Sequence, residues 1–416
     1  MLNPQIFHEY DIRGIYADTL TDEDALLLGK ALGTTMVHDN LRYAIVGADN
    51  RPSSPALKDA FIKGLTQSGI STMDLGTVTT PMVLFCANEF GADAGIVITA
   101  SHNSSDYNGI KISRKGKPLS RADYLQLKVV AESADFTKGE TQFEKYDIWP
   151  KYKESLVNNF KFSKKFNIKL DPGTGVCSLF ASELFQSLGC NLSETPDFTL
   201  TFDTDGDRLG VLGKDGKQIP SDLIAAILFK GAPKVVLNVS ILHSAAQYLK
   251  NNGTEISLSA TGYPHMMDAM EKEEAEFGAE VSGHFFFKDK HQGYNDAFYA
   301  ACRLLEVLDK SEKTLEELCA EIPTWNFTPE VHAPLPENFD KNTFLSGLVE
   351  EFSDTKQNTL DGVRFTYYDG AWGIIRLSNT EPLASARAEA KTPQRLEEIK
   401  IQIQSVLAKY QVQLQW

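Results

Sequence analysis

The sequence predicts an α/β fold made of three similar α/β domains and a smaller C-terminal α+β domain. A short apolar run, a glycine-bearing loop and an amphipathic helical pattern recur in that order along the chain. At 416 residues the chain is too long for one hydrophobic core, so we expect two to four domains. The last part of the chain changes to a hairpin pattern followed by a single helix, which sets it apart from the rest.

Three segments carry the repeated α/β pattern. The first is a buried strand at 42–49 and a helix that Ser54 and Pro55 cap and that runs until Gly69. The same order of strand, loop and helix returns at 166–189 and at 234–253. The spacing of these segments predicts three similar domains.

The final segment predicts an α+β domain. Residues 363–378 read as a hairpin around Asp369 and Gly370, and residues 395–410 read as a closing helix. Polar or proline-containing joints place the domain boundaries, which gives four domains at 1–145, 146–216, 217–326 and 327–416.

Composition narrows the class of protein. Hydrophobic residues make up 42% of the chain and charged residues 23%, which is typical of soluble globular proteins. The net charge of -15 argues against nucleic acid or an acidic membrane as a partner, so an anionic substrate would need a local basic pocket. Five cysteines without metal-like spacing read as buried thiols, and the sequence lacks a signal peptide or a long apolar run, so we expect a cytoplasmic protein.

Ser101 follows an apolar run at 94–100 and begins a loop rich in polar side chains. A buried parallel strand would deliver Ser101 to the sheet edge at which ligands of α/β proteins bind. A serine hydroxyl needs a base to become a nucleophile, and His102 and Lys111 are the candidates in this segment. The alternative is a polar turn whose serines cap backbone groups. The chain around Ser101 has no GxSxG motif, which disfavours a hydrolase triad.

Asp203, Asp205 and Asp207 come directly after an apparent strand at 198–202. Alternate side chains of an extended segment project to one side, so the three carboxylates are expected to converge on a cation. An all-oxygen site favours Mg²⁺ over zinc. A calcium EF-hand would need glycine and glutamate where this chain has Arg208 and Lys214, and the remaining alternative is a solvated acidic turn.

Two later loops suit a sugar and a phosphate. Glu280, Ser282 and His284 alternate before an aromatic run, and together they suit a row of sugar hydroxyls, although an exposed edge strand would look similar. The second loop combines guanidinium groups with hydroxyl and amide donors, as a phosphate site requires, and its residues are Arg376, Ser378, Asn379, Thr380 and Arg387. Its alternative is a turn with a helix cap before Pro382.

Together with EYDIRG at 9–14, these loops resemble the α-D-phosphohexomutase family, and most of all its bacterial phosphomannomutase/phosphoglucomutase branch. The motifs TASHN with YNGIK, DTDGDR, EVSGH and RLSNTEP occur in the family's order and cover nearly the whole chain. The resemblance implies a central cleft between the domains. It also implies a phosphoserine at Ser101, which with Asp203, Asp205 and Asp207 would hold Mg²⁺.

The resemblance assigns further roles. His102 and Lys111 would transfer protons, Glu280 and Ser282 would bind sugar hydroxyls, and His284 would lie nearby. The loop from Arg376 to Thr380, with Arg387, would hold the non-reacting phosphate. Tyr10, Arg13 and Arg208 would line the same cleft.

The implied reaction interconverts hexose 1-phosphate and hexose 6-phosphate of mannose and glucose. Phosphoserine 101 would give its phosphoryl group to a free hydroxyl, a hexose 1,6-bisphosphate would form as intermediate and activator, and the other phosphate would return to the protein. A small hexose phosphate is therefore the expected partner. The SGH and SNT motifs favour this over phosphoglucosamine mutase, whose last loop usually reads SGT.

Some positions depart from the family pattern. The segment before Phe198 is short, so the second domain looks trimmed by a strand and a helix. Tyr263 and Met267 stand where the family often has a histidine and a lysine, and Gly47, Ala48 and Asp49 replace a common GRD. Two alternatives follow, a mutase for another hexose phosphate such as glucosamine phosphate and a noncatalytic homologue that binds sugar phosphates.

Overall fold

A computed structural model describes residues 2–378 and 381–416 of the chain. These residues form two compact units. Unit 1 comprises 2–219, 283–286 and 291–315, and unit 2 comprises 220–282, 287–290, 316–378 and 381–416. The short strand β16 (Phe285–Phe287) and the helix α11 (Leu315–Ala320) lie where the chain passes from one unit to the other. Asn379 and Thr380, which the sequence assigns to the phosphate loop, lie outside the described residues.

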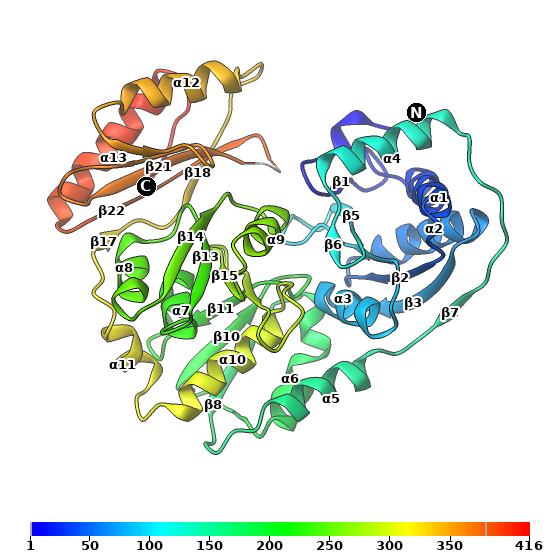
Figure 1. Ribbon diagram of the computed structural model, residues 1–416, viewed down its shortest axis with the longest axis horizontal. Coiled ribbons are helices and arrows are strands. Elements are labelled where there is room, and N and C mark those ends of the chain that lie inside the picture. The colour runs from blue at the N-terminus through cyan, green and yellow to red at the C-terminus, as the bar shows by residue number, and fades with distance from the viewer. Residues whose placement is uncertain (1, 379–380) are drawn as a thin grey trace. The chain divides into compact units, whose positions relative to one another are not determined.

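The first sheet of unit 1 has the order β1-β5-β4-β2-β3-β7, with β6 paired to β5 (Figure 1). Strands β4, β2, β3 and β7 run parallel to one another, whereas β5 is antiparallel to β1 and β4. Its strands are β1 Ile12–Ile15, β2 Tyr43–Ala48, β3 Ser71–Thr77, β4 Ala94–Ile98, β5 Tyr107–Arg114, β6 Lys117–Pro118 and β7 Phe143–Lys145. The accompanying helices are η1 Pro4–Ile6, α1 Asp22–His38, α2 Ser54–Gln67, α3 Thr80–Glu89 and α4 Arg121–Ser133.

The buried positions of strand β2 are apolar residues or glycine on both faces of this sheet. Ala44 and Val46 belong to the core that includes Phe61 of α2. Gly47, which points the other way, lies against Val83 of α3, because a Cβ at Gly47 would come within 2.6 Å of Val83. A central strand covered on both faces therefore reads as a continuous apolar run, which is the pattern that predicted it.

The second sheet of unit 1 has the order β12-β11-β10-β8-β9, with β8 parallel to β9 and β10. Phe298 of α10 packs edge-on against Phe202 of β10, with ring centroids 5.0 Å apart. A helix from much later in the chain thus completes this core (Figure 1). The elements are α5 Trp149–Asn159, β8 Asn167–Asp171, η2 Val176–Leu179, α6 Ala181–Ser187, β9 Asn191–Leu192, β10 Phe198–Phe202, β11 Leu209–Leu212, β12 Gln218–Ile219 and α10 Ala297–Lys310.

Unit 2 contains a parallel sheet and an antiparallel sheet. In the parallel sheet β13 lies between β14 and β15. Its elements are α7 Ser221–Leu228, β13 Lys234–Asn238, α8 His243–Asn251, β14 Glu255–Ser259, α9 Tyr263–Lys272 and β15 Phe277–Ala279. The antiparallel sheet has the order β17-β22-β21-β20-β19, with β18 paired to β22. Its elements are β17 Asn326–Phe327, β18 Val331–Pro334, α12 Lys341–Glu351, β19 Lys356–Asn358, β20 Val363–Thr366, β21 Trp372–Leu377, β22 Leu383–Ala390 and α13 Pro393–Ala408.

A buried polar cluster joins the two sheets of unit 2. Glu389 of β22, which is 0% exposed, accepts hydrogen bonds from the backbone N–H groups of His243 and Ser244 and so caps α8. Glu389 also accepts the indole N–H of Trp372, 2.6 Å away. Arg364 lies 3.7 Å from the centre of the Trp372 ring and donates to the backbone carbonyl of Ile241. These contacts tie the C-terminal sheet to the helices of the preceding one.

The predicted fold class is confirmed, and so are the strands, the terminal hairpin and the closing helix. Two local predictions are wrong. The N-cap of α2 is Ser53, not Ser54, whose hydroxyl instead donates to Asp49. The helix expected up to residue 189 divides into the short elements η2 and α6. The boundaries of the four predicted domains stay a prediction.

The cysteines are free thiols. Four are buried, as expected, and Cys319 is half-buried. Among the described helices, none combines the length and the apolar character needed to cross a bilayer.

Candidate functional site

Ser101 is the third residue after the buried strand β4, in the loop that leads to β5. It is 2% exposed, and its backbone has φ of 51°, the left-handed region that side chains other than glycine rarely adopt. Its hydroxyl lies 3.3 Å from Nδ1 of His102. The predicted nucleophile and one of its two candidate bases are thus in contact.

Asp203, Asp205 and Asp207 lie in the turn between β10 and β11. One carboxylate oxygen of each lies within 4.8 Å of the others. A tight turn brings them together, with Gly206 at φ of 77° and Asp203 Oδ1 accepting N–H bonds of 3.1 Å from Gly206, Asp207 and Arg208. The predicted convergence is confirmed, but its predicted cause, alternation along an extended segment, is wrong.

The acidic turn has the features of a cation site. Asp203 Oδ2 and Asp205 Oδ1 are buried and have no hydrogen-bond partner within residues 2–378 and 381–416, although Arg208 Nε lies 3.7 Å from Asp203 Oδ2. Burial, and then the negative charges of Asp207 and Asp205, raise the pKa of Asp203 well above its usual value. A hard divalent ion such as Mg²⁺ would supply the positive charge that these oxygens lack.

Lys111 of β5 connects the strand beside the serine loop with the acidic turn. Its Nζ lies 2.7 Å from Asp205 Oδ2 and 2.9 Å from Asp207 Oδ2. Burial by itself would lower the pKa of Lys111, but Asp205 and Asp207 outweigh it and raise the pKa above its usual value. The Lys111 ammonium group is thus paired with two of the three carboxylates, and its predicted part in proton transfer stays a prediction.

The surroundings of His102 keep its ring in the neutral form. The residue is exposed, yet partial desolvation of its ring, and then the nearby cations Arg208 and Arg13, lower its pKa. The imidazole is accordingly neutral at pH 7. Since Asp207 and Asp205 also act on this ring, the serine loop and the acidic turn share one electrostatic environment.

Other predicted residues of unit 1 surround these loops. Arg13 of β1 pairs with Asp11 and donates to the side chain of Asn103 in the serine loop. His284 Nε2 lies 3.2 Å from both Asp207 Oδ1 and Arg208 Nε. Tyr10 is half-buried just before β1. Tyr10, Arg13, Arg208 and His284 therefore belong to the same unit as Ser101 and the acidic turn.

The alternating pattern predicted that Glu280, Ser282 and His284 lie along one extended strand. In the structure they do not. Strand β15 ends at Ala279, β16 begins at Phe285, and Gly283 between them has φ of 95°. Glu280 is 1% exposed and accepts the N–H of Gly262 at 2.7 Å, while Ser282 is exposed. Both belong to unit 2.

The predicted phosphate loop follows β21 in unit 2. Arg376 is buried, and its Nε donates to Asp361 Oδ2 at 2.9 Å. Ser378 Oγ accepts the N–H of Glu381. The residues from Leu383 form strand β22, so the alternative of a helix cap before Pro382 is wrong.

Arg387 lies in the core of unit 2. Its guanidinium makes a bidentate pair with Asp222 at 3.0 and 2.8 Å and also donates to the carbonyl of Ser240. The residue is 4% exposed, so its donors are committed to the protein. We therefore leave Arg387 out of the proposed phosphate site, in contrast to the sequence-based prediction.

Replacing Arg387 with methionine is expected to destabilise the protein by about 3–5 kcal/mol, because Asp222 would remain buried without its partner. Arg395→Met is the matched control, since Arg395 pairs with Asp369 at the surface and its loss is expected to cost less than about 1 kcal/mol. Urea denaturation of both variants measures the difference. Equal stabilities would contradict the structural role of Arg387.

Sequence reasoning missed Asp49 and Arg51, which contact the serine loop directly. Arg51 Nη2 donates to the backbone carbonyl of Ser101 at 2.7 Å, and Arg51 Nε donates to Asp49 at 3.0 Å. A signal was present, because both residues follow β2, the parallel neighbour of β4. Polar residues at the same edge of a parallel sheet as a candidate nucleophile are expected to lie near it.

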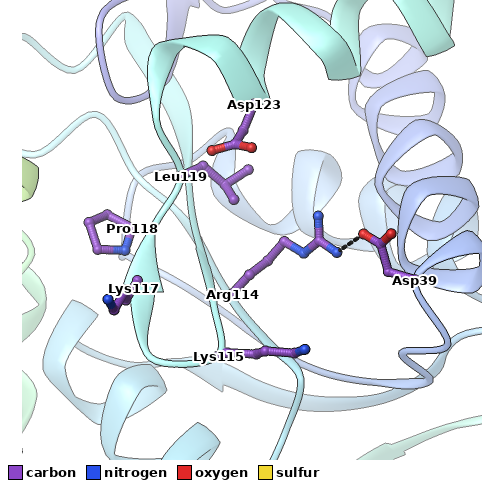
Figure 2. Close-up of a pocket in the computed structure, with 7 residues that line it drawn as sticks. All are labelled: Asp39, Arg114, Lys115, Lys117, Pro118, Leu119 and Asp123. Carbon is purple, nitrogen blue, oxygen red and sulfur yellow. Dashed lines mark hydrogen bonds and ion pairs between the residues drawn. The ribbon is translucent and has the colours of Figure 1, made fainter.

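A separate cavity of about 540 Å³ lies at the other end of the first sheet. Arg114 pairs with Ala94 at the start of β4, whereas Ser101 follows the end of that strand. Figure 2 shows Arg114 directed at Asp39, with which it forms an ion pair. Since Asp39 neutralises this cation, Arg114 is a poor candidate for a phosphate ligand. Its lining comprises Asp39, Arg114, Lys115, Lys117, Pro118, Leu119 and Asp123.

Comparison with protein families matches three parts of the chain. Residues 4–138 match phosphoglucomutase/phosphomannomutase alpha/beta/alpha domain I, residues 218–325 match alpha/beta/alpha domain III, and residues 330–405 match the C-terminal domain.

Individual proteins are similar over almost the whole length. The phosphoglucomutase of Neisseria gonorrhoeae is 34% identical over 97% of this chain and 96% of its own. The phosphomannomutase/phosphoglucomutase of Pseudomonas aeruginosa is 31% identical over 96% and 94%. The crystal structure of a phosphoglucomutase/phosphomannomutase family protein from Burkholderia thailandensis superimposes with a TM-score of 0.91 at 28% identity, covering 100% of both chains.

Proposed function

The chain belongs to the phosphoglucomutase/phosphomannomutase family, and from this premise we propose that it interconverts the 1- and 6-phosphates of mannose and glucose. It is a phosphohexomutase, an enzyme that moves a phosphoryl group within a hexose phosphate. The finer parts of the proposal are phosphorylation of Ser101, dependence on Mg²⁺, a hexose 1,6-bisphosphate as intermediate and activator, and a place in the cytoplasm.

One observation carries the proposed mechanism. The serine loop, with Ser101 and His102, lies in the same unit as the acidic turn, with Asp203, Asp205 and Asp207. Lys111 of β5, the strand that follows the serine loop, forms ion pairs with two of these carboxylates. Phosphoryl transfer requires a nucleophile and positive charge around the transferred group. The unit provides a serine beside a neutral imidazole, an ammonium ion held by two carboxylates, and a cluster of three carboxylates that suits a cation.

In the proposed reaction the bond between phosphorus and Ser101 Oγ breaks while phosphorus bonds to a sugar hydroxyl oxygen. The hydroxyl proton passes to the neutral ring of His102 and from there to Ser101 Oγ. In the second half the sugar's other phosphate returns to Ser101, and the proton moves the opposite way. No water is consumed, so the sum is an isomerisation.

Charge is the main requirement of the transition state. Mg²⁺ held by Asp203, Asp205, Asp207 and a Ser101 oxygen would supply positive charge near the transferred group. Lys111 keeps the carboxylates of Asp205 and Asp207 in place. Arg13 orients Asn103 in the serine loop, and Arg208 lies beside the acidic turn.

Further residues are proposed to bind the substrate. Glu280 and Ser282 are proposed to bind sugar hydroxyls. The loop from Arg376 to Thr380 is proposed to bind the non-reacting phosphate through guanidinium, hydroxyl and amide donors. In the structure Asp361 accepts hydrogen bonds from Nε of Arg376 and from the N–H of Thr261.

A coupled assay tests the proposed activity. Mannose 1-phosphate and glucose 1-phosphate are expected to turn over at comparable rates, with glucosamine 1-phosphate at least about tenfold slower, because a change of one polar group at a hydrogen-bonded site costs binding energy. Preferred turnover of glucosamine 1-phosphate would change the assigned substrate.

Intact-mass measurement separates an enzyme from a noncatalytic binder. Incubation with glucose 1,6-bisphosphate is expected to add one phosphate to the protein at Ser101, and mixing with glucose 1-phosphate is expected to remove it. A chain that binds hexose phosphates but never becomes phosphorylated would be a binding protein, and the proposed function would fail.

A further inference from the structure

Arg51 binds the serine loop through its backbone. Its Nη2 donates to the carbonyls of Ser101 and Asn103, each at 2.7 Å, and its Nη1 donates to those of Ser104 at 2.5 Å and Tyr107 at 3.1 Å. The fifth N–H, on Nε, donates to Asp49 Oδ2 at 3.0 Å. A guanidinium has five N–H donors, so Arg51 has none left to bind a substrate phosphate.

Asp49 holds the other side of Ser101. Its Oδ2 accepts the hydroxyl of Thr99 at 2.7 Å, and Thr99 Oγ1 in turn accepts the N–H of Ser101 at 2.9 Å. Its Oδ1 accepts the hydroxyl of Ser54 and the N–H of Arg51. The N–H and the carbonyl of Ser101 are therefore both linked to one buried ion pair, with Asp49 1% and Arg51 6% exposed.

Ser101 needs such support because of its backbone. A φ of 51° places a non-glycine residue in the left-handed region, and such a conformation persists only where its surroundings fix it. The backbone conformation also determines the direction of the Cα–Cβ bond and so the place of the hydroxyl oxygen. The contacts of Asp49 and Arg51 surround the one residue whose hydroxyl the proposed reaction uses.

We propose that Asp49 and Arg51 are positioning residues that hold Ser101 in the left-handed conformation and thereby direct its oxygen toward the transferred phosphoryl group. This inference rests on the proposed function. Neither residue touches the reacting atoms. Misplacing a reacting group by about 1 Å is enough to slow a reaction about 100-fold, so loss of these contacts is expected to lower the rate of transfer more than substrate binding.

The test compares Arg51→Ala with Lys58→Met. Lys58 lies in α2 of the same unit and forms a buried ion pair of 2.6 Å with Asp74, so its loss also destabilises the protein but leaves the serine loop intact. Each protein is phosphorylated with glucose 1,6-bisphosphate and then mixed with glucose 1-phosphate at 25 °C. Arg51→Ala is expected to transfer its phosphate about 100-fold more slowly at a nearly unchanged half-saturating substrate concentration, and Lys58→Met at the wild-type rate.

Hydrogen exchange followed by mass spectrometry tests the contacts of Asp49 and Arg51 with the serine loop without measuring enzyme activity. Peptides that cover residues 99–107 are expected to exchange at least about tenfold faster in Arg51→Ala than in the wild type or in Lys58→Met, because the loop loses its four carbonyl contacts. Thr99→Val, a change of similar shape, removes the acceptor of the Ser101 N–H and serves if Arg51→Ala does not fold. It is expected to slow transfer about tenfold and to speed exchange at Ser101.

A folded Arg51→Ala or Thr99→Val protein that transfers phosphate within threefold of the wild-type rate would overturn the inference. Unchanged exchange of residues 99–107 would do the same. If the wild-type protein accepted no phosphate at Ser101, the proposed function would be wrong. The exchange comparison would still show whether Asp49 and Arg51 hold the serine loop in place.

Discussion

Ser101→Ala is expected to abolish mutase turnover, with kcat lowered by at least about 10⁴-fold, because no other side chain can replace a covalent nucleophile. The fold should be unaffected. The Ser101 hydroxyl contacts the ring of His102, and alanine keeps the backbone contacts of the residue it replaces. The coupled assay with glucose 1-phosphate measures turnover, and circular dichroism measures the fold.

Ser105→Ala is the control, because Ser105 is an exposed serine of the same loop. It should keep the wild-type rate and the phosphate that intact mass detects. An active Ser101→Ala protein would remove Ser101 from the mechanism.

Asp205→Asn is expected to raise the half-saturating concentration of Mg²⁺ at least about 100-fold. The substitution keeps the shape of the side chain but removes the charge of a buried ligand, and loss of even an outer partner of a metal ligand costs about 10–100-fold in affinity. Titration of activity with Mg²⁺ measures the change. Calorimetry of Mg²⁺ binding to the protein without substrate provides an independent measurement.

Asp215→Asn is the matched control for the metal experiment. Asp215 lies in the next turn of the same sheet, where its carboxylate is exposed and pairs with Lys217. Its Mg²⁺ titration should coincide with that of the wild type. If Asp205→Asn gave the same curve as Asp215→Asn, the acidic turn would not be the metal site.

Local patterns were sufficient to predict the strands that present the site. The apolar runs at 42–49 and 94–100 predicted β2 and β4, because a strand buried on both faces is mostly apolar. Residues 198–202 read as an apparent strand, which is β10. These segments also placed Ser101 and Asp203 at strand ends. This much depends only on residues close together in the sequence.

Contacts between distant segments could not be predicted in this way. Arg387 looked like a phosphate ligand because arginine near a polar turn has that chemistry, and only the packing of β22 against α7 directs it to Asp222. The alternation of Glu280, Ser282 and His284 predicted one face of a strand, but Gly283 introduces a turn after which His284 meets Asp207. Which side chains pair across the chain is decided by topology, about which a local pattern carries no information.

The polar cluster of unit 2 has a consequence for how the chain unfolds. If the C-terminal sheet separated from the preceding helices, Glu389 would lose both N–H groups at the start of α8, and Arg387 would lose the carboxylate of Asp222. Stranded charges of this kind make partial opening unfavourable. The two sheets of unit 2 should therefore melt in a single cooperative transition, and the last ninety or so residues, expressed alone, should not reach a stable native state.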